Sequence, residues 1–425
     1  MKTTQPSILI INVHSTLNAG DLSLLEATIQ QLKLTFESPR IIVSANYPEE
    51  PYYQENEIKV VLSPWWLCGV SKNWSIFKQI TLWLLGSITS LRFKGRLAPQ
   101  SWQRLLKAYS EANLVVGVSG NQFYSGGRYG WPLPLTILSV QIAHHFAKPF
   151  YTMPQSIGPL RHDWERKWIK SIYQKARIVF VRDQESLNLA QSIGLSTDKI
   201  IYSPDPAFLF QSGSSTEATR ILQRWGGHPN KPAIGITILA NMGRSLKPGH
   251  INHYYKTMVA IIEKMTMILK AQVFIFLQVT GPSEIENDRT GAYTVLQQLN
   301  SHTVDSVHIV DERLSPQLLK ACYGKMDLFI ATRLHSGIFA LGMGVPTIFI
   351  GYLTKTRGMM KSLDLEDWMI QIDEIDAEQL WNKITTAWIE RGERTARLAQ
   401  QLPEVCQGAK YPAVCIAQDY QNHDR

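Results

Sequence analysis

Short, almost entirely apolar runs alternate with longer amphipathic stretches along the first half of the chain. Residues 8–13 read Ile-Leu-Ile-Ile-Asn-Val, a pattern typical of a strand that is buried on both faces. Further strand-like runs lie at 40–45, 114–118, 149–153 and 178–181, with helical patterns between several of them, as at 164–175 and 185–193. Strands that alternate with helices predict a parallel sheet covered by helices on both faces.

A turn-rich stretch, Gln211-Ser-Gly-Ser-Ser-Thr-Glu217, interrupts this pattern and predicts a linker over 211–230. The alternation then restarts with a predicted helix at 254–269 and predicted strands at 233–238, 273–278, 307–310, 328–331 and 346–350. We therefore predict an α/β protein with two doubly wound, Rossmann-like lobes, 1–210 and 231–400, and a central cleft. For the remaining tail, 401–425, packing back on the N-terminal lobe is one option. Ligands of such sheets bind beyond the carboxyl ends of the strands.

Length and composition fit this architecture and limit the partners. A chain of 425 residues exceeds one average domain, and 44% hydrophobic with 18% charged residues is typical of globular proteins. The balance of 43 basic and 35 acidic side chains leaves a net charge of +8, which favours an acidic ligand or an anionic surface. No basic stripe interleaved with aromatic residues appears, so we expect no nucleic-acid partner.

Cysteine usage and the N-terminal residues bear on the compartment. The four cysteines, Cys68, Cys322, Cys406 and Cys415, form no Cys-x-x-Cys pair, which fits a reducing compartment and argues against structural zinc. The apolar run at 8–11 is too short for the core of a signal peptide. We therefore expect a cytoplasmic protein.

Residues 60–91 fit the alternation less well because they are rich in aliphatic side chains and hold four tryptophans. Their apolar core, 80–91, is interrupted by Ser and Gly and is shorter than the roughly 20 residues that a membrane span needs. One interpretation is an interfacial helix in peripheral contact with the inner face of a membrane, since Trp and the basic residues that follow favour that layer. The other is an ordinary helix packed on the sheet or on a second subunit.

Two loops that follow predicted strands carry residues able to contact a ligand. In Asn18-Ala-Gly-Asp21 the glycine lets backbone N–H groups approach an anion at a helix N-terminus, although Asp21 could equally be a plain N-cap. The Gly-rich segment 117–122 contains Asn121. Its glycines allow either the approach of a ligand or a tight turn.

Three further segments lie at later strand ends or beside the predicted linker. The loop at 153–159 contains Gln155, which could bind sugar hydroxyls, although turn chemistry explains its Pro and Gly without a ligand. Arg182 could clamp a phosphate or a carboxylate by its fork of donors, or form an ion pair with a nearby acid. Ser203-Pro-Asp-Pro206 lies just before the linker, where its prolines could simply shape the crossing.

The strongest group of candidate residues lies at 326–336. The predicted strand delivers Arg333 and His335 to its carboxyl end, and Ser336 begins a helix whose free amides add positive potential. Alternation in an extended loop would point Arg333 and His335 the same way. A histidine can donate a proton near neutral pH, and Lys355, after the next strand, would lie beside the same pocket. An isolated histidine is more often structural, but the neighbouring cations favour an anion-binding and acid–base site.

The candidate segments occur in a fixed order along the chain. They are Asn-x-Gly-Asp at 18–21, the Gly-rich 117–123, Pro-Gln-Ser-Ile-Gly-Pro at 154–159, Val-Arg-Asp-x-x-Ser at 181–186, Pro-Asp-Pro at 204–206, Thr-Arg-Leu-His-Ser at 332–336, Gly-Val-Pro at 344–346 and Gly-Tyr-x-x-Lys at 351–355. This ordered set resembles the polysaccharide pyruvyl transferase family over most of the chain. Any one segment is unspecific, but their order and spacing together make the match strong.

The resemblance implies a fold and an activity. The fold is a glycosyltransferase-B-like (GT-B-like) pair of lobes. The activity is transfer of pyruvate from phosphoenolpyruvate onto a sugar as a cyclic ketal, in a cell-envelope or exopolysaccharide pathway. His335 corresponds to the general acid of the family, and Arg182, Arg333 and Lys355 correspond to clamps on the donor. We expect no metal and no cofactor beyond phosphoenolpyruvate as co-substrate.

The full predicted site has a donor side and an acceptor side. Catalytic roles fall on His335, Arg182 and Lys355, donor binding on Arg333, Lys355, Arg182, Ser336 and Arg244, and acceptor binding on Asn18, Asp21, Asn121 and Gln155. Family members often carry an Arg directly after the first strand of the second lobe. Here the nearest is Arg244, so either Arg244 takes that role from a longer loop or donor binding is altered. The acceptor could be a nucleotide sugar, a lipid-linked glycan or a polymer.

Two other functions are compatible with these residues, because a fold does not fix a function. One is a nucleotide-sugar-dependent glycosyltransferase or epimerase on the same two-lobe scaffold. The other is a non-catalytic interaction protein that retains the pocket.

Overall fold

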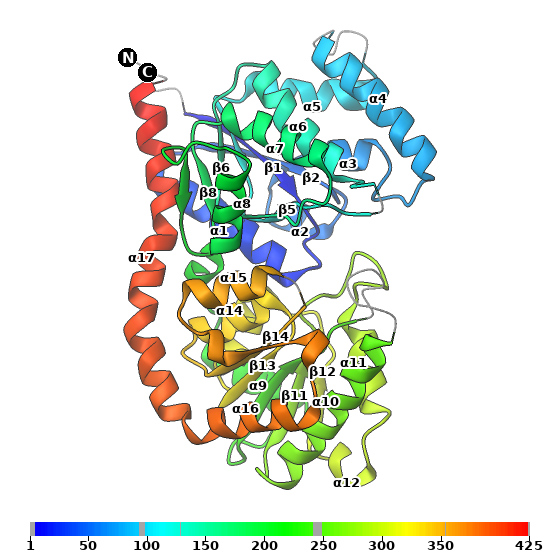
Figure 1. Ribbon diagram of the computed structural model, residues 1–425, viewed down its shortest axis with the longest axis vertical. Coiled ribbons are helices and arrows are strands. Elements are labelled where there is room, and N and C mark those ends of the chain that lie inside the picture. Colours follow the sequence, from blue (N-terminus) through cyan, green and yellow to red (C-terminus); the bar gives the residue numbers. More distant parts are fainter. Residues whose placement is uncertain (1–4, 93–97, 128, 241–248, 353, 424–425) are drawn as a thin grey trace. The chain divides into compact units, whose positions relative to one another are not determined.

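The chain divides into two compact units by its internal contacts. The computed structural model describes residues 5–92, 98–127, 129–240, 249–352 and 354–423. Unit 1 comprises Met1–Thr16, Leu24–Pro206 and Gln407–Arg425, and unit 2 comprises Leu17–Ser23 and Ala207–Cys406. Each unit is built on parallel sheets with helices packed against them (Figure 1). The predicted α/β fold class with two lobes is confirmed.

Unit 1 contains two parallel sheets. The five-stranded sheet has the order β3-β2-β1-β4-β6, with β1 (Ser7–Val13), β2 (Arg40–Ala45), β3 (Lys59–Leu62), β4 (Leu114–Gly117) and β6 (Phe150–Thr152). The four-stranded sheet has the order β5-β7-β8-β9, with β5 (Gly120–Phe123), β7 (Gln155–Ile157), β8 (Val179–Val181) and β9 (Ile200–Tyr202). Their helices are α1 (Ala19–Thr35), α2 (Pro51–Glu55), α3 (Pro64–Leu67), α4 (Ile76–Arg92), α5 (Gln100–Glu111), α6 (Leu133–His145), α7 (Asp163–Gln174) and α8 (Gln184–Ser192).

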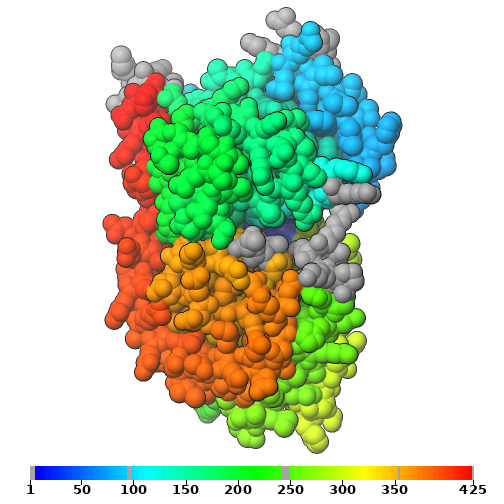
Figure 2. Space-filling view, in the orientation of Figure 1, coloured from blue at the N-terminus to red at the C-terminus, as the bar shows by residue number. Residues whose placement is uncertain are grey.

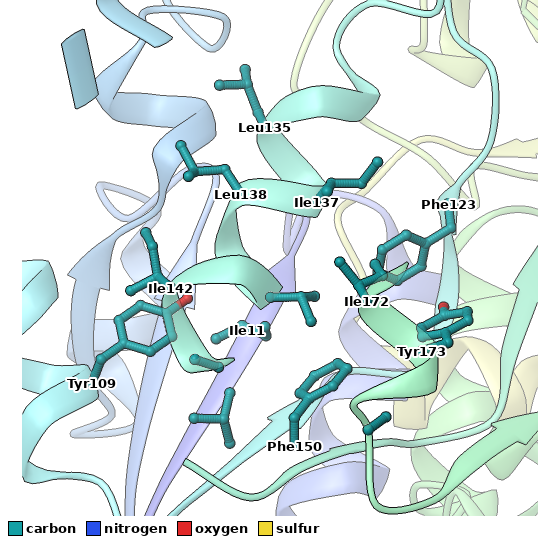
Figure 3. Packing of buried hydrophobic residues seen from close by; sticks show 14 of the residues in the cluster. Ile11, Tyr109, Phe123, Leu135, Ile137, Leu138, Ile142, Phe150, Ile172 and Tyr173 are labelled. Carbon is teal, nitrogen blue, oxygen red and sulfur yellow. The ribbon is translucent and has the colours of Figure 1, made fainter. Parts of the chain in front are cut away.

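Helix α6 lies at the centre of the unit 1 core. Ten of its 13 residues are buried, as expected for a helix that is apolar all round and covered on every side. Its side chains form one cluster with Ile11 of β1, Tyr109 of α5 and Ile172 of α7 (Figure 3). Burying each such side chain contributes about 1.5–3 kcal/mol, so this cluster fixes the strand ends that carry the loops of unit 1.

Unit 2 contains one six-stranded parallel sheet. Its order is β12-β11-β10-β13-β14-β15, with β10 (Ala233–Thr237), β11 (Gln272–Phe276), β12 (Val307–Val310), β13 (Leu328–Ala331), β14 (Thr347–Gly351) and β15 (Met369–Gln371). Numbered from the first strand of the unit, this is the order 3-2-1-4-5-6 of dinucleotide-binding sheets. The strand order reverses between β10 and β13, and ligands of such sheets bind at that point.

The helices of unit 2 include one in the predicted linker. They are α9 (Ser215–Arg224), α10 (His250–Met267), α11 (Asp288–Leu296), α12 (Ser301–Val304), α13 (Pro316–Tyr323), α14 (Leu334–Gly342), α15 (Thr354–Ser362), α16 (Ala377–Ile389) and α17 (Arg391–His423), with 3-10 turns η1 (Pro206–Leu209), η2 (Glu366–Trp368) and η3 (Ile372–Glu374). Ser214 caps α9, which buries Ala218, Ile221 and Leu222, so most of 211–230 is a packed helix. Residues 401–423 continue α17, and from Gln407 this helix belongs to unit 1.

Candidate active site

The junction between β13 and α14 carries Arg333 and His335. Helix α14 begins at Leu334 with Arg333 as its N-cap residue, so the prediction of an extended loop through His335 was wrong. The helix begins earlier because the Arg333 carbonyl accepts hydrogen bonds from the Ser336 hydroxyl (2.7 Å) and the Gly337 amide (3.3 Å). His335 therefore lies in the first turn of a helix, where the backbone amides produce a positive potential.

Hydroxyl groups join the carboxyl ends of β10 and β13 at the point where the strand order reverses. Thr237 Oγ1 lies 2.8 Å from Ser336 Oγ and accepts a hydrogen bond from the Thr332 amide (3.2 Å). The Tyr254 hydroxyl lies 2.8 Å from Thr332 Oγ1 and accepts from the Leu239 amide (3.2 Å). The predicted donor ligand Ser336 is fully buried in this network, which fixes the start of α14.

Arg333 forms a buried ion pair with Asp288, the first residue of α11. Its Nε and Nη2 donate to Asp288 Oδ1 at 2.9 and 2.6 Å, and the side chains are 8% and 1% exposed. Nη2 also donates to the Glu286 carbonyl (3.1 Å), and Nη1 donates to the Tyr352 hydroxyl (3.4 Å). Asp288 Oδ2 accepts from the Val279 amide (2.9 Å). The guanidinium thus links three segments of unit 2.

Burial and attraction act in opposite directions on this pair. Burial disfavours the charge on Arg333, but attraction and hydrogen bonds to Asp288 and Tyr352 together outweigh it and raise the pKa of the guanidinium above its ordinary value. Burial raises the pKa of Asp288, and the charge of Arg333 opposes that rise. Arg333 therefore stays charged, and a ligand carboxylate bound here would share the guanidinium with Asp288.

The segment Leu17–Ser23 brings Gly20 against His335. This segment belongs to unit 2, where the Ala19 amide donates to the Gln278 carbonyl (3.1 Å) and the Thr280 amide donates to the Leu17 carbonyl (3.0 Å). A Cβ atom at Gly20 would lie 2.4 Å from His335 Nδ1, far inside contact distance. Gly20 is therefore needed for the close approach of the imidazole, which is a more specific reason than the anion contact considered from the sequence.

Asn18 rather than Asp21 caps helix α1. Asn18 Oδ1 accepts hydrogen bonds from the Gly20 amide (3.0 Å) and the Asp21 amide (3.3 Å). Asp21 lies inside the first turn of the helix, so its suggested role as N-cap was wrong. The helix starts at Ala19, before Asp21, and leaves the Asp21 carboxylate half-buried at its positive end.

Lys355 lies in the first turn of α15 and is half-buried. Its helix follows β14, the direct neighbour of β13 in the sheet, and the bond from Arg333 to Tyr352 joins the two loops. The other predicted donor ligand on a unit 2 loop, Arg244, lies outside the described residues.

Arg182 occupies a buried polar network in unit 1. Its Nη1 forms an ion pair with Asp205 of the Pro-Asp-Pro segment, the two side chains being 3% and 2% exposed. Its Nε donates to Ser156 Oγ (2.9 Å), and that hydroxyl donates to Asp183 Oδ2 (2.6 Å). Asp183 in turn caps α8. Of the two interpretations of Arg182, the structure contains the ion pair. Three of the segments that resemble the family, 154–159, 181–186 and 204–206, meet in this network.

The predicted acceptor ligands of unit 1 differ in accessibility. Gln155 is fully buried, donates to the Val118 carbonyl (2.8 Å) and accepts from the Tyr173 hydroxyl (2.9 Å). Its amide therefore connects the loop after β4 with β7 and α7. Asn121, on β5, is half-buried.

Several residues of the site could not be identified from the sequence. Asp288, Thr237 and Tyr254 reach β13 and α14 from distant parts of the chain. The only local signal is Asn287-Asp288, which reads as a helix start because Asn287 is the N-cap of α11. Among the described residues, no group of three or more His, Cys, Asp and Glu side chains could hold a metal ion.

Comparison with known proteins identifies the family of the chain. The model of the family described as polysaccharide pyruvyl transferase matches residues 18–354. The chain belongs to this family. The match begins at Asn18 and includes both the His335 junction and the Arg182 network. A relative in Erwinia amylovora, the amylovoran biosynthesis protein AmsJ, is 25% identical over 385 residues, which cover 87% of this chain and 88% of the relative.

Solved structures with low sequence identity share the fold of this pyruvyl transferase family member. The putative UDP-N-acetylglucosamine 2-epimerase of Listeria monocytogenes is 11% identical, with a TM-score of 0.59, and covers 100% of this chain and 98% of its own. HepE of Anabaena, in complex with UDP-glucose, is 13% identical, with a TM-score of 0.56 and coverage of 98% and 99%. At these identities the likeness shows the fold alone, and it confirms the GT-B-like architecture.

Proposed function

We propose that this pyruvyl transferase family member moves the enolpyruvyl group of phosphoenolpyruvate onto a sugar as a pyruvate ketal and releases phosphate. The observation that carries the proposal is the place of His335. It is held against Gly20 in the first turn of α14, at the strand-order reversal of unit 2. A proton donor in a helix N-terminal turn can act on a bound anion.

In the proposed reaction His335 donates a proton to the methylene carbon of phosphoenolpyruvate, which becomes a methyl group. One sugar hydroxyl adds to C2, and the C2–O bond to phosphate breaks. A second hydroxyl then attacks C2 and closes the ketal ring. Of the two hydroxyl protons, one replaces the proton that His335 gave and the other leaves with phosphate, so the atoms balance without water. The step requires no metal.

The predicted ligands fall into a donor group and an acceptor group. Lys355, Arg333 and Arg244 are the proposed donor ligands, because cations stabilise the charge that develops on the departing phosphate. Asn18, Asp21 and Asn121 are the proposed acceptor ligands. Arg182 and Ser336 stay proposed donor ligands and Gln155 a proposed acceptor ligand; like Arg333, each of them also donates to protein groups, which holds its side chain in place.

The acceptor is proposed to belong to a polysaccharide pathway of the cell envelope. The name of the relative AmsJ, an amylovoran biosynthesis protein, supports an exopolysaccharide or its precursor. A nucleotide-sugar-dependent glycosyltransferase or epimerase is the second candidate, because structures with this fold include UDP-N-acetylglucosamine 2-epimerases.

The test is to incubate the full chain with phosphoenolpyruvate and a panel of nucleotide sugars, lipid-linked sugars and polymers. Release of phosphate that depends on the acceptor, with a gain of pyruvate mass in the acceptor, supports the proposal. Release of a nucleoside diphosphate, or interconversion of a nucleotide sugar without phosphoenolpyruvate, supports the second candidate.

A matched pair of variants tests the role of His335. His335→Asn is expected to reduce kcat by about 100-fold or more, the contribution of a positioned general acid. His302→Asn, at an exposed position on α12, is expected to have no effect. A His335→Asn enzyme that folds normally and retains the wild-type kcat would contradict this role.

A further inference from the structure

Helix α4 carries most of its large apolar side chains on the outside, while Leu82, Trp83 and Leu91 are partly buried and pack against the unit 1 core. Its buried residues are Gln79, Gly86 and Ser90. Its exposed residues include six large apolar side chains, Ile76, Phe77, Ile80, Leu84, Leu85 and Ile88, of which Phe77 is 80% exposed. We call these six side chains the α4 face. An exposed apolar patch of this kind marks an interaction site more often than a solvated surface.

The buried side of α4 is fixed, so the helix cannot turn its apolar side chains inward. Gln79 donates to the Trp74 carbonyl (2.6 Å) and accepts from Trp131 Nε1 (2.6 Å). A Cβ atom at Gly86 would lie 2.3 Å from the Trp102 ring, so only glycine fits there. A rotation of the helix would put aliphatic side chains in the place of the Gln79 amide, which makes the hydrogen bonds, and in the place of Gly86, where no side chain fits.

The surroundings of the α4 face are basic. Between Glu57 and Glu111 the sequence contains no Asp or Glu. Lys72 and Lys78 are exposed and lie over tryptophan rings, with Nζ 3.3 Å from the Trp66 ring centroid and 3.6 Å from the Trp74 ring centroid. Arg92 is exposed at the C-terminal end of the helix. Tryptophan, lysine and arginine beside an apolar helix face are typical of segments that lie in the headgroup layer of a membrane.

We propose that the α4 face docks on the surface of an anionic lipid bilayer, with α4 lying in the plane of the headgroups. The charge favours a bilayer over a second copy of the chain, because in a two-fold dimer this patch would meet itself and bring like charges together. Figure 2 shows the blue surface of α4 at the outer edge of unit 1. No helix within the described residues is long and apolar enough to cross a membrane. The docking is independent of the reaction proposed above.

The test is co-sedimentation of the full chain with vesicles of phosphatidylcholine, with or without phosphatidylglycerol. The wild-type protein is expected to bind the anionic vesicles, and added salt is expected to weaken binding because it screens the basic residues. The double variant Phe77→Glu, Leu84→Glu is expected to bind at least about tenfold less, since two inserted side chains are lost and two repulsive charges are gained.

Leu34→Glu is the matched control, because Leu34 is 72% exposed on α1 of the same unit and is expected to bind like the wild type. Thermal unfolding of all three proteins checks that the substitutions leave the fold intact. Wild-type protein that stays in the supernatant with anionic vesicles would overturn the proposal, as would a double variant that binds equally well. A dimer seen by analytical ultracentrifugation that the double variant dissociates, without any vesicle binding, would assign the α4 face to self-association instead.

Discussion

At the scale of single residues, the contact between Gly20 and His335 is the most restrictive feature of the candidate site. His335 is 9% exposed, and its ring lies where any side chain at position 20 would lie. Two family segments far apart in the chain, Asn-x-Gly-Asp and Arg-Leu-His, thus meet through one glycine. Small displacements of a positioned catalytic group are costly, so this contact is expected to matter for rate.

Gly20→Ala is expected to reduce kcat by about 10–100-fold, because the methyl group must push the His335 ring or the start of α1 out of place. The control is Gly392→Ala, at a helical position on α17 where an added Cβ meets no atom within 4 Å. Steady-state kinetics with phosphoenolpyruvate and the acceptor give kcat for both variants. If Gly20→Ala keeps the wild-type kcat, the contact has no role in positioning His335.

The sequence was sufficient to place some of these residues and not others. The apolar run before Arg333 and His335 predicts a strand, which puts both residues near its carboxyl end. Asp288, the partner of Arg333, could not be found because the ion pair depends on how α11 packs and no local pattern encodes it. The early start of α14 depends on the bonds of Ser336 and Gly337 to the Arg333 carbonyl, which are also invisible in a hydrophobic pattern.

At the scale of elements, the Arg333–Asp288 pair connects the β13–α14 junction to α11 and to the loop after β14. The partners are almost completely buried, so each compensates for the lost hydration of the other. Removing one charge from such a pair leaves the other unpaired in a region of low polarity. The pair is therefore expected to be important for both the stability of unit 2 and the geometry of the site.

Asp288→Asn is expected to lower the free energy of unfolding by about 3–5 kcal/mol, because it leaves the Arg333 charge uncompensated. The new amide NH2 group would also face the Val279 amide, which now donates to Asp288 Oδ2. Urea unfolding measures the change. The matched control, Asp311→Asn, breaks the partly exposed pair with Arg289 and is expected to cost about 0–1 kcal/mol. Equal losses in the two variants would contradict the importance assigned to burial.

Helix α4 shows where sequence patterns are ambiguous for an element. The apolar residues of 60–91 suggested either a membrane-facing helix or a helix packed on the protein, and periodicity cannot separate the two. The two differ in which side of the helix is buried, and here Gln79, Gly86 and Ser90 are buried while Leu82, Trp83 and Leu91 are partly buried against the core. Which side is buried depends on two tryptophans from other elements. Trp102 of α5 packs against Gly86, and Trp131, just before α6, donates to Gln79.

At the scale of the whole molecule, the alternation of strands and helices was enough to predict two parallel α/β lobes. The strands β3, β5, β7, β9 and β15 were not predicted. Of these, β5 reads Gly-Asn-Gln-Phe and β7 reads Gln-Ser-Ile, so neither forms an apolar run. The order of the strands within each sheet could not be predicted from the sequence either, because it depends on how the connections between the strands cross over the sheet. The grouping of Leu17–Ser23 with unit 2 is a further tertiary property that no local pattern indicates.

Stability of the folded chain is expected to fall as the pH is lowered below about 6.5. Burial lowers the pKa of His144, whose ordinary value is 6.5, and Nε2 lies 2.8 Å from the Ile172 carbonyl. The unfolded chain therefore binds the proton first as the pH falls, so protonation favours unfolding and the contribution of this group is complete only above that value.

Urea unfolding of the wild type and of His144→Gln, from about pH 8 to about pH 5, isolates this contribution. The variant is expected to lose less stability than the wild type on the acidic side, while other groups titrate alike in both. Identical pH profiles would show that the His144 ring titrates in the folded state as it does in the unfolded chain.

The central claim is that His335 protonates the methylene carbon of phosphoenolpyruvate during transfer to a sugar, and isotope incorporation tests it most directly. The reaction is run in D2O with the full chain, phosphoenolpyruvate and the acceptor, and the ketal product is analysed by mass spectrometry. The account predicts one deuterium in the methyl group of each transferred pyruvyl unit, and transfer that is slower by about 100-fold or more with His335→Asn. A ketal whose methyl group carries no solvent deuterium, or full transfer by His335→Asn, would contradict it.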